Sequence, residues 1–232
     1  MISRAYHPAT FNIAVSKEAA RVCYVLIPEG LSADTSKWAE EVAQEFKCNL
    51  VFISGIDWNR DMSPWSAKGV MKKEKEFTGG ADIYLKALTE DYIPDIEKQL
   101  FSQNPENGYH RYLIGISLSG LFAVWSIFKT SLFDGIGAIS ASLWFDGFTE
   151  WASNQTPASS AKLRICLGSR EKNSLDKRLA TVEQKSRETV SILMHKGLDA
   201  ALEMVPGTHF SPMEPRFRFI LGQILTSTEF SK

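Results

Sequence analysis

The chain has few cysteines and no long apolar run, and both shortages limit what it can be. Its 232 residues include only 3 cysteines, Cys23, Cys48 and Cys166. They are odd in number and widely spaced, so they form neither a metal-ligand pattern nor a disulfide framework. Because Cys23 and Cys166 fall in apolar segments, we expect them to be free, buried thiols. No stretch approaches the roughly 20 apolar residues of a membrane span.

An excess of charge of either sign is also missing. The 26 Lys and Arg residues nearly balance the 27 Asp and Glu residues, which leaves a formal net charge of −1. This balance gives no reason to expect a nucleic acid or an anionic membrane as partner. Residues 1–10 lack the apolar core of a signal peptide, so we expect a cytoplasmic protein.

What is present is the composition and periodicity of one α/β domain spanning residues 1–232. Hydrophobic residues make up 44% and charged residues 23% of the chain, as in ordinary globular proteins. Short, continuous apolar runs alternate with segments of helical spacing, and continuous runs predict strands buried on both faces. The chain should therefore form a mostly parallel central sheet with helices on both faces. The predicted strands are 11–15, 22–27, 50–54, 112–116, 136–140, 163–167 and 202–205, and the predicted helices are 38–46, 81–100, 118–128 and 176–195.

Residues 55–80 resist this reading, because they are irregular and carry a run of charges. Loops of this length in compact domains often serve as lids or substrate loops, and a mobile connection is the alternative.

A serine lies at the junction between the predicted strand 112–116 and the helix after it, in the sequence GISLSG (residues 115–120). A sharp turn at this place would lift the Ser117 hydroxyl above the sheet and onto a helix N-terminus, as in a nucleophile elbow. The motif departs from Gly-x-Ser-x-Gly because Ser119 replaces the second glycine. Ser119 lacks glycines two residues away on either side, so it is the poorer nucleophile candidate. A purely structural turn is the alternative.

Histidine is scarce, with 4 in the chain, and a reactive serine needs one as its base. His209 follows the predicted strand 202–205, so it should lie at the carboxyl edge of the sheet together with Ser117. We expect His209 to be the base. The remaining histidines lie in the N-terminal segment, at the opposite end of the nucleophile's strand, or late in a helix: His7, His110 and His195.

The acid that orients the base should come between the serine and the histidine along the chain. Glu171 follows the predicted strand 163–167 and suits this role, with Asp176 as the alternative. An oxyanion hole needs two N–H donors. Leu118 should supply one, and Gly30 or Leu31, in the loop after strand 22–27, should supply the other.

Six stretches between residues 22 and 225 resemble one known family. They are RDMSP (60–64), GGAD (79–82) with Ile93 and Pro94, GISLSGLF (115–122), SASLW (140–144), LGSREK (167–172) with RLATV (178–182), and PGTHF (206–210). Together they are similar to the putative esterase (esterase D-like) family of α/β-hydrolases, and closest to its enterochelin and siderophore esterase branch. The resemblance implies an α/β-hydrolase fold.

The resemblance also implies a serine esterase with Ser117, Glu171 and His209 as its triad, and it places Arg60 and Trp144 near the substrate. A surface ion pair is the alternative for Arg60, and packing is the alternative for Trp144. We therefore predict hydrolysis of a small-molecule ester, of siderophore type if the branch holds, through an acyl-enzyme and without metal or cofactor. The alternatives are an acyltransferase and a hydrolase-fold protein that only binds.

Overall fold

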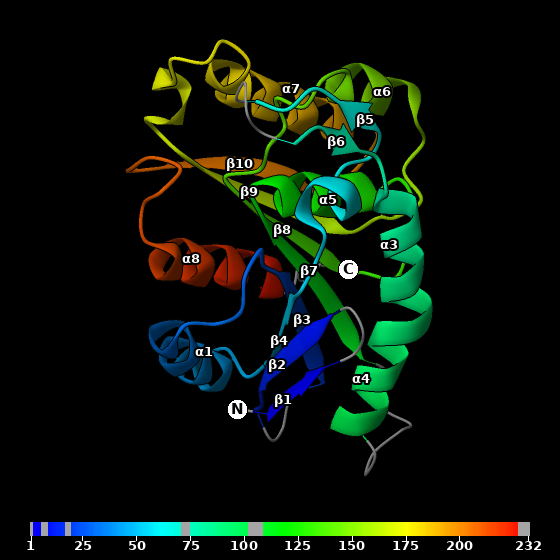
Figure 1. Cartoon of the computed structure of the whole chain (residues 1–232), viewed down its shortest axis with the longest axis vertical. Helices are drawn as coiled ribbons and strands as arrows, with labels where there is room; N and C mark the ends of the chain where they lie inside the picture. Colours follow the sequence, from blue (N-terminus) through cyan, green and yellow to red (C-terminus); the bar gives the residue numbers. More distant parts are fainter. Residues whose placement is uncertain (1, 6–8, 17–19, 71–74, 102–108, 227–232) are drawn as a thin grey trace, which may run out of the picture.

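One sheet dominates the computed structural model, which describes residues 2–5, 9–16, 20–70, 75–101 and 109–226. Its strand order is β1-β2-β4-β3-β7-β8-β9-β10 (Figure 1). In that order the strands are Ile2–Ala5, Thr10–Ala14, Asn49–Ser54, Arg21–Leu26, His110–Ile116, Gly135–Ile139, Lys162–Gly168 and Ala200–Val205. The two pairings of β2 are antiparallel and the others are parallel. The prediction of a mostly parallel sheet is therefore confirmed.

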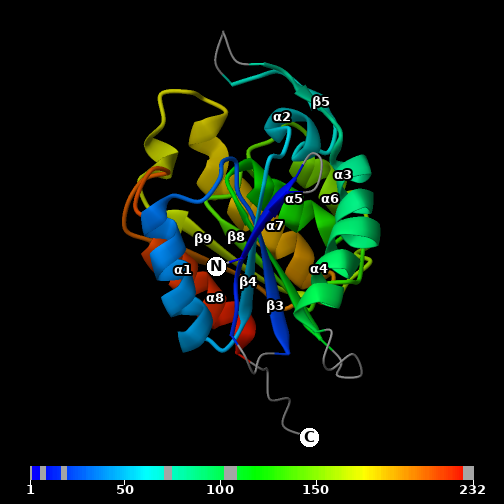
Figure 2. The same cartoon turned by 60° about the horizontal axis from the view of Figure 1, so that its bottom comes forward.

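Helices cover both faces of this sheet, also as predicted. Figure 2 shows α1 and α8 on one side, and α3 and α4 on the other. The helices are α1 Ala33–Glu45, α2 Trp58–Asp61, α3 Ala81–Ala87, α4 Ile93–Leu100, α5 Leu118–Ser126, α6 Phe148–Asn154, α7 Val182–His195 and α8 Met213–Leu225. Within the described ranges, none has both the length and the hydropathy to cross a membrane.

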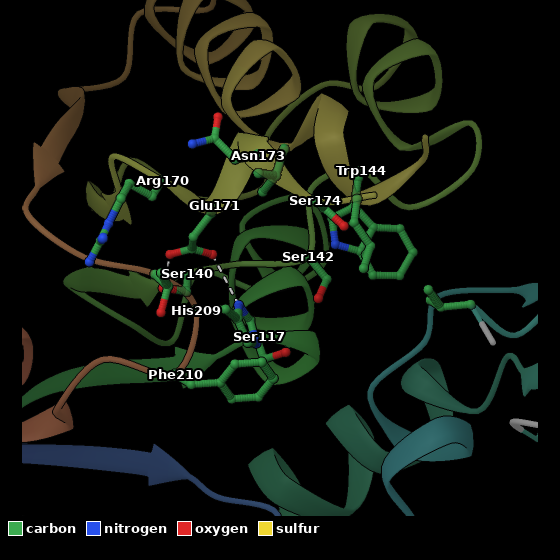
Figure 3. Close-up of a pocket in the computed structure, with 14 residues that line it drawn as sticks. Ser117, Ser140, Ser142, Trp144, Arg170, Glu171, Asn173, Ser174, His209 and Phe210 are labelled. Carbon is green, nitrogen blue, oxygen red and sulfur yellow. Dashed lines mark hydrogen bonds and ion pairs between the residues drawn. The ribbon is translucent and has the colours of Figure 1, made fainter. Parts of the chain in front are cut away.

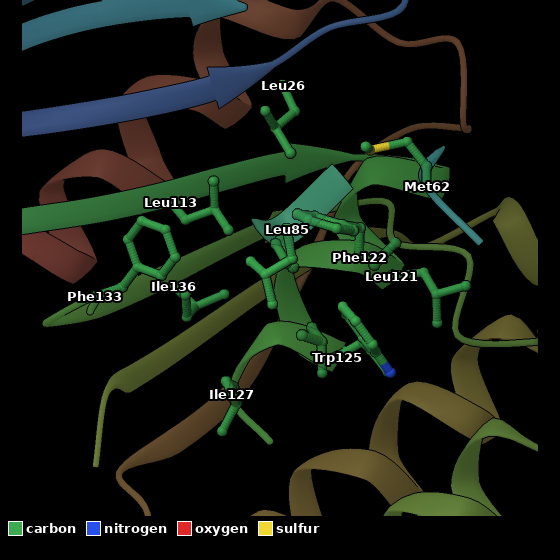
Figure 4. Close-up of a cluster of buried hydrophobic side chains, with 14 of the residues drawn as sticks. Leu26, Met62, Leu85, Leu113, Leu121, Phe122, Trp125, Ile127, Phe133 and Ile136 are labelled. Atoms are coloured by element: carbon green, nitrogen blue, oxygen red, sulfur yellow. The ribbon is translucent and has the colours of Figure 1, made fainter. Parts of the chain in front are cut away.

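Strand β3 demonstrates why its apolar run is continuous. Tyr24 and Leu26 point into the core under α3 to α7, whereas Cys23 and Val25 point into the core under α1 and α8. Successive side chains of a strand point to opposite faces, so a strand covered on both sides must be apolar at every position. Figure 4 shows Leu26 among the side chains of the first of these cores, to which Phe122 of α5 also belongs.

The predicted helix 81–100 is continuous but changes its winding. Between α3 and α4, a π-helical turn spans Leu88–Tyr92. The N–H of Ile93 bonds the carbonyl of Leu88, and Pro94 follows within the first turn of α4. Proline has no N–H and crowds the carbonyl four residues earlier, so a wider turn at this point accommodates it.

The segment 55–80 holds more regular structure than its sequence predicts. It contains α2 and a small two-stranded sheet of β5 (Ser66–Ala67) and β6 (Phe77–Thr78). Residues 71–74 of this segment lie outside the described ranges. Whether the segment acts as a lid stays a prediction.

Candidate active site

The GISLSG turn has the strained backbone that its sequence predicts. Ser117 has φ 58° and ψ −118° and precedes the first residue of α5. Its N–H bonds the carbonyl of Ile139 at 2.9 Å, and its own carbonyl accepts from the N–H of Ser142 at 2.9 Å. A non-glycine residue in this region is held there by its surroundings, and such strain clusters at functional sites.

Ser119, the departure from the usual motif, is fully buried and bonded. Its hydroxyl lies 2.9 Å from the carbonyl of Leu26 and 3.0 Å from that of Ile116, and it accepts from the Ile116 N–H at 2.8 Å. The glycine that lets α5 pack closely is instead Gly120, because a Cβ on this residue would lie 2.8 Å from the Cβ of Ala141. Ser119 therefore ties the turn to the end of β3 and is not free to act as a nucleophile.

His209 and Glu171 form a bonded pair at the carboxyl edge of the sheet (Figure 3). His209 follows β10, and Glu171 begins a 3-10 turn, Glu171–Asn173, after β9. The Nδ1 of His209 lies 3.0 Å from the Oε2 of Glu171. An ionised carboxylate only accepts hydrogen bonds, so Nδ1 carries a proton, and in the neutral imidazole Nε2 is an acceptor.

The carboxylate of Glu171 is held in its charged form. Burial raises its pKa, but hydrogen bonds from His209, Ser140 and the Gly168 N–H outweigh burial and bring the pKa below its ordinary value. Such a group stabilises the fold above its unfolded pKa, about 4.3, and this contribution is lost as the pH falls through the lowered value.

Asp176, the alternative acid, is used elsewhere. Its Oδ1 accepts from the N–H groups of Arg178 at 2.8 Å and Leu179 at 3.1 Å. These bonds begin the short helical turn Leu179–Thr181 that leads into α7. The structure thus brings Glu171, and not Asp176, against His209.

Ser117, Glu171 and His209 line one cavity of about 360 Å³, a size ordinary for small-ligand sites. Among the hydrogen bonds of the described residues, none joins the Ser117 hydroxyl directly to His209. Catalytic hydrogen bonds are often long without substrate and tighten in the complex, so the shared cavity is the informative observation. Apolar side chains supply much of the remaining wall: Val70, Trp144, Leu179, Val182 and Phe210.

The other predicted site residues divide between those at the cavity and those away from it. Trp144 lines the cavity, with the Arg178 guanidinium 5.2 Å from its ring centre. Leu118 begins α5, so its N–H has no acceptor within the helix. Gly30 and Leu31 follow β3 but do not line this cavity, and neither does Arg60, which pairs with Asp61 at 2.8 Å.

Of the remaining histidines, His110 and His195 do not line the cavity. His110 lies 3.5 Å from Asp134 near the start of β7, and the Nδ1 of His195 lies 2.7 Å from the Ser191 carbonyl. His7 lies outside the described residues.

Sequence reasoning missed two polar residues behind the pair, Ser140 and Arg216. Arg216 is only 5% exposed, and its Nη1 donates to the Ser140 hydroxyl at 2.6 Å. A signal was available, because Arg216 lies four residues before Ile220 and eight before Ile224, on the buried stripe of a helix. A cation in such a stripe indicates a buried partner.

Comparison with known proteins agrees with this geometry. A family model described as "Putative esterase" matches residues 32–225. The chain belongs to this family. The uncharacterized protein YbbA of Bacillus subtilis (strain 168) is 29% identical over 184 residues, which are 75% of this chain and 71% of that protein. Membership of the family confirms the prediction of an ester hydrolase.

Comparison with solved structures shows which fold the chain shares. The siderophore hydrolase EstA of Aspergillus nidulans is similar with a TM-score of 0.72 at 20% identity, over 94% of this chain and 89% of that chain. An IroE-like serine hydrolase of Shewanella oneidensis also has a TM-score of 0.72, at 21% identity over 94% and 74% of the two chains. These likenesses confirm the predicted α/β-hydrolase fold.

Proposed function

We propose that this member of the esterase family is a serine esterase that hydrolyses a small-molecule carboxylic ester through an acyl-enzyme. One observation carries the proposal. The strained Ser117 shares a cavity with a bonded His209–Glu171 pair whose carboxylate is charged and whose Nε2 is free to accept a proton. This is the set of groups that turns a weak serine hydroxyl into a nucleophile.

In the first half of the reaction, the Ser117 oxygen attacks the ester carbonyl carbon while the Nε2 of His209 takes the hydroxyl proton. The carbonyl oxygen becomes an oxyanion as the new C–O bond forms. When the tetrahedral intermediate collapses, the bond to the alcohol breaks, and His209 passes its proton to the leaving oxygen. Glu171 keeps the imidazole in the required tautomer and stabilises the imidazolium.

In the second half, His209 deprotonates a water molecule that attacks the acyl-enzyme, and the carboxylic acid leaves as Ser117 regains its proton. Two N–H groups would hold the oxyanion in both halves, one from Leu118 and one from Gly30 or Leu31. The bond from Ser119 to the Leu26 carbonyl supports this arrangement, because it fixes the end of β3 beside the turn.

The cavity favours an ester with a flat or branched apolar group. Trp144, Val70 and Phe210 offer that group apolar surface, and Arg170 and Asn173 add polar contacts at the same cavity. A siderophore-type ester is our candidate, since EstA, a siderophore hydrolase by its name, shares the fold. That Arg60 contacts the substrate stays a prediction.

A fluorophosphonate probe tests the nucleophile. The wild-type protein should be labelled on Ser117, and Ser117→Ala should not be labelled at all, since the probe reacts with an activated serine. The measurement is the mass of the labelled peptide. As a control, Ser153→Ala changes a serine of α6 whose hydroxyl bonds the Glu150 carbonyl, and it should be labelled like wild type. Wild-type protein as resistant as Ser117→Ala would contradict the proposal and favour a protein that only binds.

The same acyl-enzyme would serve an acyltransferase, so product analysis with and without an added alcohol or amine separates the two activities. We further propose that the chain acts in the cytoplasm, a view supported by three cysteines that are all buried and free.

A further inference from the structure

A buried arginine reaches two loops that carry the proposed catalytic groups. Arg216 lies in the first turn of α8, and its guanidinium bonds three backbone carbonyls of the preceding loop. The Nε donates to the carbonyl of Pro212 at 3.3 Å, and the Nη2 donates to the carbonyl of His209 at 3.3 Å and to that of Ser211. The Arg216 guanidinium thus holds the segment that carries His209 through the carbonyl groups of that segment.

The other guanidinium nitrogen reaches the acid through a serine. Arg216 Nη1 lies 2.6 Å from the Ser140 hydroxyl, and that hydroxyl lies 2.6 Å from the Oε1 of Glu171. Arginine can only donate, so the Ser140 oxygen accepts from it, and the hydroxyl proton is directed to the carboxylate. The hydrogen bonds therefore run in one direction, with Arg216 donating to Ser140 and Ser140 donating to Glu171.

The two oxygens of Glu171 therefore have separate tasks. Oε1 receives the Ser140 hydroxyl and, at 2.8 Å, the N–H of Gly168, whereas Oε2 faces His209. A carboxylate with one oxygen held twice cannot rotate without losing both bonds. Ser140 itself has φ 49°, a conformation uncommon for a serine, and its N–H is bonded to the Cys166 carbonyl at 2.8 Å.

Stability alone does not account well for this arrangement. The guanidinium lies 3.9 Å from Glu171 Oε1, both groups are buried, and burying such a pair often stabilises a fold no more than apolar residues would. The guanidinium does connect Glu171, which follows β9, to the loop of His209, which follows β10.

We propose that Arg216 and Ser140 are positioning residues, which together hold the Glu171 carboxylate and the His209 loop at the separation that catalysis requires. The inference rests on the proposed serine esterase. Ser140 lines the cavity, but its hydroxyl is bonded to Glu171 and Arg216, and Arg216 does not line the cavity, so each acts through Glu171 or through the loop backbone.

The test compares Arg216→Lys and Ser140→Ala with wild type, using an ester that the wild-type protein hydrolyses. Ser140→Ala should lower kcat roughly 10-fold by removing one hydrogen bond to a charged group. Arg216→Lys should lower kcat on the order of 100-fold, because a small displacement of reacting groups has that effect. KM should stay unchanged in both, because the Ser140 hydroxyl is already engaged by Glu171 and Arg216, and the Arg216 guanidinium lies away from the cavity. Arg218→Gln, a change on the same helix at an arginine paired with Glu214 and Glu45, should keep wild-type kcat.

A double-mutant comparison of Ser140→Ala with Glu171→Gln distinguishes a positioning role from a general loss of structure. In a Glu171→Gln background, Ser140→Ala should lower kcat no further, since its effect passes through the carboxylate. The inference would be overturned if both single variants kept the wild-type kcat. It would also be overturned if Ser140→Ala lowered kcat by the same factor in the Glu171→Gln background as in the wild-type protein. If Arg216→Lys does not fold, Ser140→Ala and its coupling decide the matter. Wild-type protein without hydrolysis or probe labelling would instead contradict the proposed function itself.

Discussion

Ser117 and Ser119 stand two residues apart in the same turn, and their surroundings give them different chemistry. Ser117 lines the cavity, whereas the Ser119 hydroxyl is buried and has backbone partners on two strands. A hydroxyl with all its bonds satisfied has little reason to leave them. The same contrast separates Glu171, whose Oε2 meets the imidazole, from Asp176, whose carboxylate begins a helical turn.

At the residue scale, we therefore expect the two acids to respond differently to neutralisation. Glu171→Gln should lower kcat on the order of 10⁴-fold, because an amide NH₂ facing His209 favours the wrong imidazole tautomer. Asp176→Asn should leave kcat near wild type, because an amide oxygen still accepts from the Arg178 N–H. Hydrolysis of a chromogenic ester under saturating conditions measures both. The reverse ranking would move the assignment of the acid to Asp176.

At the element scale, the site depends on how closely α5 follows β7. A Cβ on Gly115 would lie 2.0 Å from the Ser119 carbonyl oxygen, and one on Gly120 would lie 2.9 Å from the Cα of Ala141. Both obstacles are backbone atoms, which cannot rotate away as a side chain can. The helix is held this close by apolar packing on the sheet, with Phe122 and Trp125 fully buried.

Gly115→Ala should consequently destabilise the fold by about 3 kcal/mol or more, at the upper end of overpacking changes. The matched change Gly30→Ala meets no atom within 4 Å and should alter stability little. Urea unfolding followed by far-ultraviolet circular dichroism gives both free energies. Equal stabilities of the two variants would mean that the turn can relax more than its packing indicates.

At the scale of the whole molecule, Arg178 connects segments that are far apart in the sequence. Its guanidinium donates to the carbonyl of Lys68 at 2.9 Å, pairs with Asp146 at 2.9 Å and stacks on Trp144. Lys68 lies two residues before Val70, which lines the cavity. One side chain after β9 thus holds part of the segment 55–80 against the segment after β8.

Arg178→Gln should raise KM roughly 10-fold and change kcat little, because it loosens the cavity wall and leaves the reacting groups in place. An effect of this size corresponds to about 1.4 kcal/mol of lost binding. Arg111→Gln is the matched control, since Arg111 is equally exposed, at 27% of its side chain, and pairs with Glu97 away from the cavity. Steady-state kinetics distinguish the outcomes, and a fall in kcat alone would contradict this role.

The sequence predicted the strands of the main sheet other than β1, and the positions of Ser117, Glu171 and His209, because those depend on local patterns. A buried run such as 112–116 identifies a strand, and the residue after it must lie at the carboxyl edge. By contrast, the part played by Arg216 depends on its contact with Ser140, 76 positions away in the sequence. Arg60 pairs with its own neighbour Asp61 in α2, and an ion pair is the alternative that the sequence left open for it.

The order of the strands has a consequence for how the molecule is made. The proposed nucleophile follows β7, while its base follows β10, which is the last strand among the described residues and the outermost of that side of the sheet. A nascent chain that has emerged only as far as β8 already contains Ser117 but lacks His209, the histidine proposed to activate it. Hydrolysis would then begin only after β10 has joined the sheet, and chains released before that point would be inactive.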